Sequence, residues 1–149
     1  MNRLKIHIIR GVPGTGKSTL AETLAREFNA VHCEADQFFE KNGHYHFDIT
    51  KLGDAHDFCY EKARKALSQG YDVVVSNTFT QFREMKNYLD LAIDFNAEVK
   101  ITTLVHEYGS IHNVPAGTME KMRNRIESQS QVVQKAAQYL MQLRHEDHI

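Results

Sequence analysis

The chain has 149 residues, 42% of them hydrophobic, which is enough for a single domain with one sizeable core. Its 18 Lys and Arg residues almost balance its 19 Asp and Glu residues. The formal net charge of −1 excludes a strong overall field directed at nucleic acid, a membrane or an acidic partner. The N-terminal residues reach a glycine after only a few apolar positions, which is too short for a signal peptide or a membrane span. We therefore expect a cytoplasmic protein with no membrane contact.

The two cysteines, Cys33 and Cys59, lie far apart and lack C-x-x-C spacing. This pattern suits a reducing compartment and argues against a disulfide framework or a structural zinc site. We interpret both as buried, inert thiols.

Short apolar runs alternate with stretches of helical periodicity. The runs that predict strands lie at residues 4–10, 30–35, 71–76 and 99–105. The third contains the unbroken triplet Val73-Val74-Val75, which is typical of a buried central strand. Predicted helices follow the first three runs, ending near residue 28 and covering residues 51–69 and 80–96. This alternation predicts right-handed crossovers and a parallel sheet of four or five strands, covered by helices on both faces.

The last third of the chain carries no further strand signal. Residues 106–118 are largely polar, with Pro115, and predict a short lid. One helix is predicted from about residue 119 to about residue 144. It has more apolar length than it needs to reach the sheet, so it either packs across the domain's own open face or mediates formation of a homo-oligomer.

The run from Gly11 to Ser18 matches the phosphate-binding pattern G-x-x-x-x-G-K-[ST] between a predicted strand and a predicted helix. Its glycines let successive backbone N–H groups turn toward a phosphate at the positive end of the helix. Lys17 would supply a point charge to the β- and γ-phosphates, and the Ser18 hydroxyl can coordinate Mg²⁺. The sequence therefore predicts a doubly wound α/β fold of the P-loop NTPase or kinase-like class that binds ATP or GTP with Mg²⁺. The predicted nucleotide-binding residues are Gly11, Val12, Pro13, Gly14, Thr15, Gly16, Lys17, Ser18 and Thr19.

Polar residues also follow the next two predicted strands. Asp36 comes just after the second strand, and Asn77 and Thr78 come at the carboxyl end of the third. A kinase needs a group that takes the proton from the acceptor hydroxyl, and a carboxylate at this edge of the sheet can do so. Asp36 is that candidate; its alternative role is an N-cap for the residues that follow it. No acidic residue follows the third strand, so we expect Mg²⁺ on Ser18 and the nucleotide, with Asp36 nearby through water.

Four segments together resemble the kinase half of phage polynucleotide kinase and a related set of small eukaryotic P-loop proteins. The phosphate-binding pattern is shared by very many P-loop proteins, whereas the order and spacing of the others are more discriminating. The resemblance covers roughly residues 1–127. Its segments are Gly11 to Thr19, Ala35-Asp36-Gln37-Phe38-Phe39, Asp72-Val73-Val74-Val75-Ser76-Asn77-Thr78, and Val114-Pro115 leading to Met119-Glu120-Lys121-Met122.

The resemblance implies a 5′-hydroxyl or similar hydroxyl acceptor and a requirement for Mg²⁺. It places Asp36 in the position of the family's general base, with Asn77 and Thr78 lining the acceptor side. Phe38 and Phe39 stand where the family has an acceptor-binding arginine; aromatic rings there could stack on a nucleobase, although at least one is expected in the core.

The lid departs from the family pattern, because residues 106–113 contain no arginine. An arginine that clamps the transferring group contributes about 10³- to 10⁵-fold in rate. Arg123 and Arg125, on the following helix, are the candidates to replace it; the alternative is an ordinary charged helix face.

Three functions are consistent with these residues. The first choice is a kinase for the 5′-hydroxyl of a polynucleotide. The second is a nucleoside, nucleotide or small-molecule kinase, which the near-neutral charge favours because oligonucleotide binders usually show a basic groove. The third is a nucleotide-binding regulatory or interaction module with weak or no catalysis, which the arginine-poor lid favours.

Overall fold

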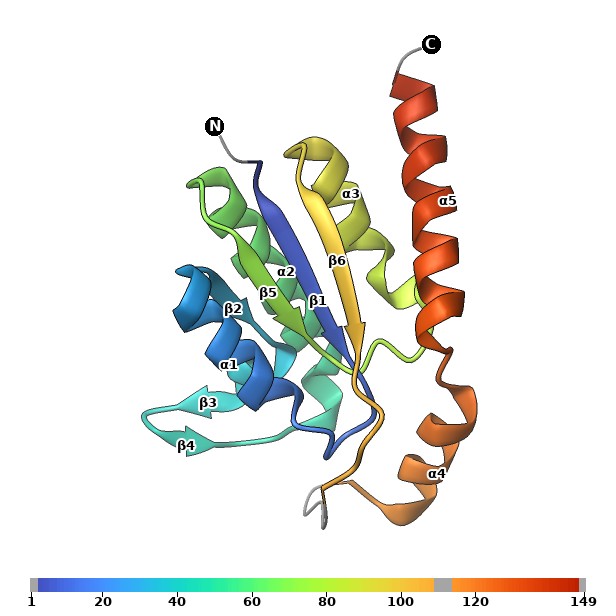
Figure 1. Ribbon diagram of the computed structural model, residues 1–149. Helices are drawn as coiled ribbons and strands as arrows, with labels where there is room; N and C mark the ends of the chain where they lie inside the picture. The colour runs from blue at the N-terminus through green and yellow to red at the C-terminus, as the bar shows by residue number, and fades with distance from the viewer. Residues whose placement is uncertain (1–2, 109–113, 148–149) are drawn as a thin grey trace.

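Four parallel strands form the central sheet of the protein (Figure 1). The computed structural model describes residues 3–108 and 114–147. The sheet order is β2-β5-β1-β6, which confirms the predicted parallel sheet. Its strands are β1 (Lys5–Arg10), β2 (Val31–Cys33), β5 (Val73–Ser76) and β6 (Glu98–Thr103).

The middle of the sheet is built by β1 and β5. All four residues of β5 are buried, as the valine triplet predicts for a strand covered on both faces. Ile8 of β1 lies in register with Val75 on one side and Ile101 of β6 on the other. This register of apolar residues sets the position along the sheet at which β1 ends and the phosphate-binding loop begins.

Helices cover the two faces unequally (Figure 1). On one face α1 (Lys17–Phe28) packs against β5, β2 and β1. The opposite face carries α2 (Leu52–Ser68) and α3 (Lys86–Asp94). The prediction that helices cover both faces is therefore confirmed, and the exposed part of the sheet is at β6, where Glu98 and Lys100 alternate with the core residue Ile101.

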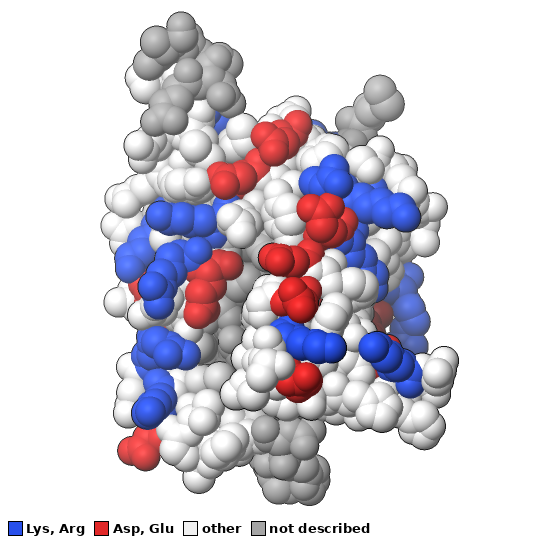
Figure 2. All heavy atoms as spheres, turned by 180° about the vertical axis from the view of Figure 1, so that it is seen from behind, with Lys and Arg blue, Asp and Glu red and all other residues white. Residues whose placement is uncertain are grey.

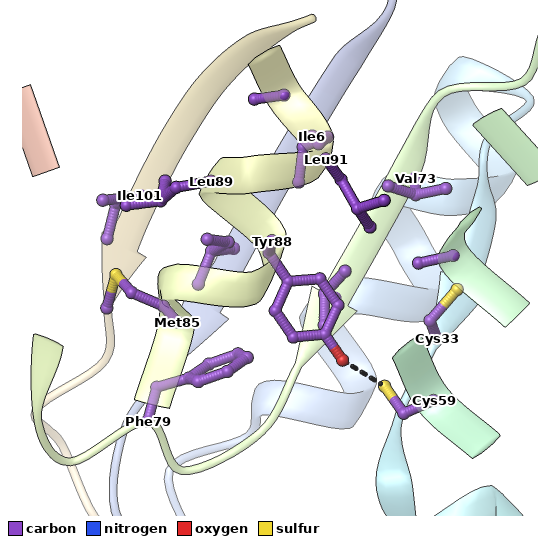
Figure 3. Close-up of a cluster of buried hydrophobic side chains, with 14 of the residues drawn as sticks. Ile6, Cys33, Cys59, Val73, Phe79, Met85, Tyr88, Leu89, Leu91 and Ile101 are labelled. Carbon is purple, nitrogen blue, oxygen red and sulfur yellow. Dashed lines mark hydrogen bonds between the residues drawn. The ribbon is translucent and has the colours of Figure 1, made fainter. Parts of the chain in front are cut away.

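The larger core lies between the sheet and helices α2 and α3 (Figure 3). Tyr88 of α3 points across it, and its hydroxyl donates to the Cys59 sulfur at 3.2 Å. Cys33 and Cys59 are both buried free thiols, as expected, and burial raises the pKa of Cys33 to about 12. Neither thiol is therefore a nucleophile at neutral pH.

A small hairpin projects from the chain between β2 and α2. A 3₁₀ helix, Ala35–Phe39, leads from β2 into β3 (Glu40–Lys41), which pairs with β4 (His44–Tyr45). Asn42 and Gly43 connect the two strands with φ of 53° and 80°, the left-handed pair that a two-residue hairpin turn requires. The Asn-Gly signal in the sequence predicts this turn.

The C-terminal segment forms two helices, α4 (Ala116–Arg125) and α5 (Gln129–Asp147), so the single helix predicted over residues 119–144 is wrong. Ile126 adopts an extended conformation, and Ser128 begins the second helix through a capping box with Gln131. The predicted lid, residues 106–118, lies partly outside the described residues, and its last three residues belong to α4.

Helix α5 packs beside α3 and β6, as the first of the two alternatives for the C-terminal helix expects. Val132 and Ala136 are buried in the larger core, with Leu140 packed against it. This packing accounts for much of the apolar length of the helix. Across residues 3–108 and 114–147, no helix has the length and apolar character needed to cross a membrane.

Candidate active site

The predicted site residues follow the carboxyl ends of neighbouring parallel strands. Gly11 follows β1, Asp36 follows β2 after two residues, and Asn77 follows β5. Such ends meet at one edge of an open α/β sheet, which is where these folds bind their ligands. The order β2-β5-β1 therefore brings the three segments together, although they are far apart in the sequence.

The loop from Gly11 to Gly16 is shaped by close backbone approaches. A Cβ atom at Gly11 would lie 2.7 Å from the Leu104 carbonyl oxygen, so this position requires glycine. Gly14 and Gly16 have φ of 87° and 83°, and Gly16 directly precedes α1. The first N–H groups of α1 thus face the loop, as an anion-binding helix terminus requires.

Lys17 is the first residue of α1, and its side chain folds back over the loop. Its Nζ donates to the Val12 carbonyl oxygen at 3.1 Å. Burial lowers the pKa of Lys17, while Glu34 and Asp36 act in the opposite direction and favour its charged form. The side chain is therefore held where a bound phosphate would meet its positive charge.

Glu34 is a site residue that sequence reasoning missed. Its Oε1 accepts hydrogen bonds from the Ser18 hydroxyl at 2.6 Å and from the Ser76 hydroxyl at 2.8 Å. Such an acidic residue is expected after the third strand, whereas this carboxylate directly follows β2. Its position two residues before Asp36 was the available signal.

The donors around Ser18 fit a magnesium ion. Ser18 and Glu34 present oxygen atoms, which Mg²⁺ prefers over nitrogen or sulfur. In the described part of the chain, no group of three or more His, Cys, Asp or Glu side chains could hold a metal ion by itself. A cation here would therefore also need oxygen atoms from a nucleotide.

Asp36 lies exposed in the 3₁₀ helix that follows β2. Its Oδ1 accepts a hydrogen bond from the Tyr45 hydroxyl at 3.2 Å. The pKa of Tyr45 is raised to about 12, by burial first and then by Asp36. The alternative role of Asp36 as an N-cap is wrong, because Glu34 occupies the cap position and its N–H donates to the Gln37 side chain at 3.2 Å.

Asn77 and Thr78 lie beside both groups. The Asn77 side-chain oxygen accepts from the Ala35 N–H at 3.0 Å, next to Asp36. The Thr78 carbonyl oxygen accepts from the Gly11 N–H at 3.2 Å. The end of β5 is therefore joined to the candidate base on one side and to the phosphate-binding loop on the other.

Arg10 is a second residue that sequence reasoning missed, and it is completely buried. Its guanidinium donates to the carbonyl oxygens of Phe79 and Thr80 at 2.8 and 3.2 Å, and to the Thr103 hydroxyl at 2.8 Å. Burial lowers the pKa of Arg10. The residue ties the end of β1 to the segments that follow β5 and end β6, but it does not face the loop opening.

The two candidate lid-replacing arginines have different neighbours. Arg123 forms a bidentate ion pair with Glu107, with N–O distances of 2.7 to 3.2 Å. Glu107 adjoins Tyr108, whose N–H donates to the Gly14 carbonyl oxygen at 2.8 Å. Arg125 instead donates to the Thr80 hydroxyl at 3.1 Å. Arg123 is thus connected to the phosphate-binding loop, and Arg125 to the segment after β5.

Two hollows flank the loop. One of about 700 Å³ lies over the start of α1 and is lined in part by Thr19, Leu104 and Tyr108. The other, about 850 Å³, is lined by Asn77 and Thr78 together with residues of α2 and α3. The loop therefore has one hollow on its helix side and one on the side of the strand ends.

The sequence matches a protein family described as an AAA domain over residues 6–143. The chain belongs to this AAA-domain family. NEDD4-binding protein 2 of Homo sapiens is 37% identical over 91 residues, which is 60% of this chain but only 5% of the human protein. The chain therefore represents a small part of that relative's length.

Solved structures that include kinases are similar to this chain in fold. The Pnkp1/Rnl/Hen1 RNA repair complex matches 98% of this chain and 47% of its own chain, with a TM-score of 0.57 and 17% identity. A gluconokinase from Sinorhizobium meliloti 1021 matches 99% of this chain and 98% of its own, with a TM-score of 0.55 and 16% identity. These values confirm the predicted P-loop kinase-like fold and the resemblance to such kinases.

Proposed function

We propose that this AAA-domain protein transfers the terminal phosphoryl group of ATP or GTP to the 5′-hydroxyl of a polynucleotide. The observation that carries the proposal is the position of Asp36, exposed beside the phosphate-binding loop and electrostatically coupled to Lys17. A donor site and a proton acceptor then lie at one edge of one sheet. The kinase-like fold and the matched family support this reaction class.

Each residue has a distinct role in this reaction. Asp36 takes the proton from the acceptor hydroxyl as that oxygen bonds to the γ-phosphorus and the bond to the β-phosphate bridging oxygen breaks. Lys17 and the N–H groups of the loop hold the β- and γ-phosphates, and Asn77 and Thr78 line the acceptor side. Mg²⁺ bound at Ser18 would neutralise charge on the phosphate oxygens. We assign stabilisation of the transferring group to Arg123, released from its ion pair with Glu107.

The hollow beside α1 suits the base of the nucleotide. Tyr108 lies over the loop, because a Cβ atom at Gly16 would meet its ring at 3.8 Å. Tyr108 is 75% exposed, so much of its ring surface is accessible to a ligand. Leu104 and Leu20 supply apolar contacts next to it. We assign this hollow to the adenine or guanine ring.

Aromatic side chains on the hairpin support a polynucleotide acceptor. Tyr45 and Phe47 are 42% and 45% exposed, and their rings are nearly parallel, with centroids 6.4 Å apart. Tyr45 also contacts Asp36. Stacking of single-stranded bases on such rings contributes about 1–3 kcal/mol per base. Phe39 is buried and Phe38 half-buried, so the exposed rings are not the two singled out from the sequence.

The test is an Asp36→Asn variant assayed with a 5′-hydroxyl oligonucleotide, labelled ATP and Mg²⁺. Loss of a general base should lower kcat by about 10²- to 10⁴-fold while ATP affinity stays within a few fold of wild type. Asp54→Asn, at an exposed position on α2, is the matched control and should retain full activity. Equal activity of Asp36→Asn and wild type would overturn the role of Asp36.

A second candidate, a kinase for a nucleoside, nucleotide or other small hydroxyl compound, is favoured by the charge of the acceptor-side hollow. Asp57, Glu61 and Glu84 line it, and the lining residues include no Lys or Arg. Acidic side chains also gather along the middle of this face of the protein (Figure 2). Carboxylates repel a phosphate backbone but accept hydrogen bonds from sugar hydroxyls.

An acceptor panel separates these functions. Transfer to oligonucleotides supports the first proposal, whereas transfer to nucleosides or sugars but never to oligonucleotides supports the second. Tight ATP binding without transfer or hydrolysis anywhere in the panel would replace both with a nucleotide-binding regulatory or interaction module.

A further inference from the structure

Glu34 receives more converging hydrogen bonds than a helix cap requires. The Ser18 and Ser76 hydroxyls both donate to its Oε1, from the start of α1 and the end of β5. The Glu34 side chain is only 13% exposed and lies 3.9 Å from His32 Nε2. A buried carboxylate with this many donors is held in one position.

A chain of side chains behind Glu34 fixes the direction of these hydrogen bonds. Because the single Ser76 hydroxyl proton goes to Glu34, His32 Nε2 must be the donor in its 2.7 Å contact with the Ser76 oxygen. His32 Nδ1 is then an acceptor, and the Gln37 amide nitrogen lies 3.4 Å from it. Lys62 donates in turn to the Gln37 oxygen at 2.8 Å. Every donor in this series points toward Glu34.

This arrangement also orients Ser18. The Ser18 proton is directed to Glu34, so the lone pairs of its oxygen remain available for another partner. Ser18 is the residue through which P-loops hold the cation that accompanies the nucleotide. A carboxylate at 2.6 Å from it lies within reach of water molecules bound to the same ion.

We infer that Glu34 is the carboxylate that positions Mg²⁺ in this protein, by orienting the Ser18 hydroxyl and by accepting a hydrogen bond from water on the ion. It takes the place of the acidic residue that is missing after β5, where Ser76 instead supports Glu34. Asp36 is thereby left to the acceptor hydroxyl. The inference rests on the proposed nucleotide and Mg²⁺ site, but not on the identity of the acceptor.

The test measures binding of a non-hydrolysable ATP analogue by calorimetry, once with Mg²⁺ and once with EDTA. The ratio of the two affinities reports the contribution of the ion. Glu34→Gln keeps an oxygen that can accept from both serines but removes the charge. We expect it to lower the ratio by about 10- to 100-fold, the usual cost of losing an outer-shell partner of a metal. Its affinity in EDTA should equal or exceed that of wild type, because a negative charge near the phosphates is gone.

Matched variants separate this role from a merely structural one. Asp36→Asn and Glu27→Gln, the latter at an exposed position on α1, should keep the wild-type ratio. Ser76→Ala removes one donor to Glu34 and should lower the ratio by a smaller factor. Thermal unfolding checks whether Glu34→Gln is folded. If it is not, Ser76→Ala still tests the inference.

Several results would overturn the inference. In Glu34→Gln, an unchanged ratio or an equal loss of affinity with and without Mg²⁺ would do so. So would a wild-type affinity that does not depend on Mg²⁺, or a ratio that is lost in Asp36→Asn and not in Glu34→Gln. If Glu34→Gln does not fold, an unchanged ratio in Ser76→Ala would do the same. A wild-type chain that binds no analogue in either buffer would overturn the nucleotide site as well, whereas a negative acceptor panel alone would leave the inference standing.

Discussion

The donor and acceptor sides of the site are built in different ways. On the donor side, one continuous loop, Gly11 to Gly16, presents backbone groups whose geometry is fixed by glycines and by contacts such as the one with Leu104. On the acceptor side, the surface is made by side chains of separate elements: Tyr45 of the hairpin contacts Asp36, and residues of α2 and α3 line the hollow beside Asn77 and Thr78. The first surface is specified by local sequence, and the second by packing between distant segments.

This difference explains why the fold identifies the phosphoryl donor more closely than the acceptor. A triphosphate has one chemistry, so one loop geometry serves it in many proteins. Acceptors differ in shape and charge, and here an aromatic hairpin lies on one side of the strand ends while a carboxylate-lined hollow lies on the other. The fold therefore fixes the donor, while the exposed side chains around the strand ends determine the acceptor.

Lys17→Ala should break the donor side and have the largest effect. Loss of a charge-assisted contact to phosphate should weaken triphosphate binding by about 10- to 100-fold. It should also lower the rate of transfer by a further factor of about 10² to 10³. Equilibrium binding and single-turnover kinetics measure the two terms. Lys65→Ala, exposed on α2, is the control, and unchanged binding in Lys17→Ala would refute the phosphate-binding role of the loop.

Arg123→Ala should affect transfer but not binding. If Arg123 replaces the missing lid arginine, its loss should lower kcat by about 10³-fold or more, with little change in ATP affinity. Arg125→Ala should lower kcat by less than about tenfold, because that side chain is bound to Thr80. The ranking is measured by kcat under saturating ATP. A larger defect in Arg125→Ala would reverse the assignment.

A matched pair of tyrosine substitutions distinguishes the two sides directly. Tyr108→Ala should raise the dissociation constant for ATP by about 5- to 160-fold, since a stacking contact is worth about 1–3 kcal/mol. Tyr45→Ala should raise KM for the oligonucleotide by a similar factor and leave ATP binding intact. Tyr45→Phe, which keeps the ring but loses the hydrogen bond to Asp36, separates stacking from that contact. If Tyr108→Ala and Tyr45→Ala raised the dissociation constant for ATP equally, the two tyrosines would not belong to separate donor and acceptor sites.

The smallest effect is expected from the acidic hollow. Asp57→Asn combined with Glu61→Gln should increase kcat/KM for an oligonucleotide a few fold at low salt, because two repelling charges are removed. The gain should shrink at high salt as screening increases. Steady-state assays at two ionic strengths measure it. For a small uncharged acceptor that hydrogen-bonds to these carboxylates, the same variant should instead lose activity.

The sequence predicts elements whose determinants are local. The valine triplet of β5, the glycine spacing of the loop and the Asn-Gly turn each depend on a few adjacent residues, and the structure has all three. The break between α4 and α5 also has a local signal, the Ser128-x-x-Gln131 capping box, but it lies inside a longer helical periodicity that hides it.

Tertiary features had no comparable signal. Glu34 meets Ser18 because α1 packs over β2 and β5, and sequence spacing does not report that distance. In the sequence, Arg10 is indistinguishable from an ordinary polar residue at the end of a strand. Its burial results from contacts with β6 and with the segment after β5.

The buried guanidinium of Arg10 has a consequence for motion. It joins Phe79 and Thr80 on the acceptor side to β1, one residue before the phosphate-binding loop, and to Thr103 where β6 ends. Three connections therefore share one rigid cross-link that lies away from solvent. Backbone amides around it should exchange with solvent deuterium at similar, slow rates, as a single cooperative unit, while the hairpin exchanges quickly. Adaptation to a substrate is thereby concentrated in the hairpin, while the ends of β1 and β6 and the segment after β5 keep their relative positions.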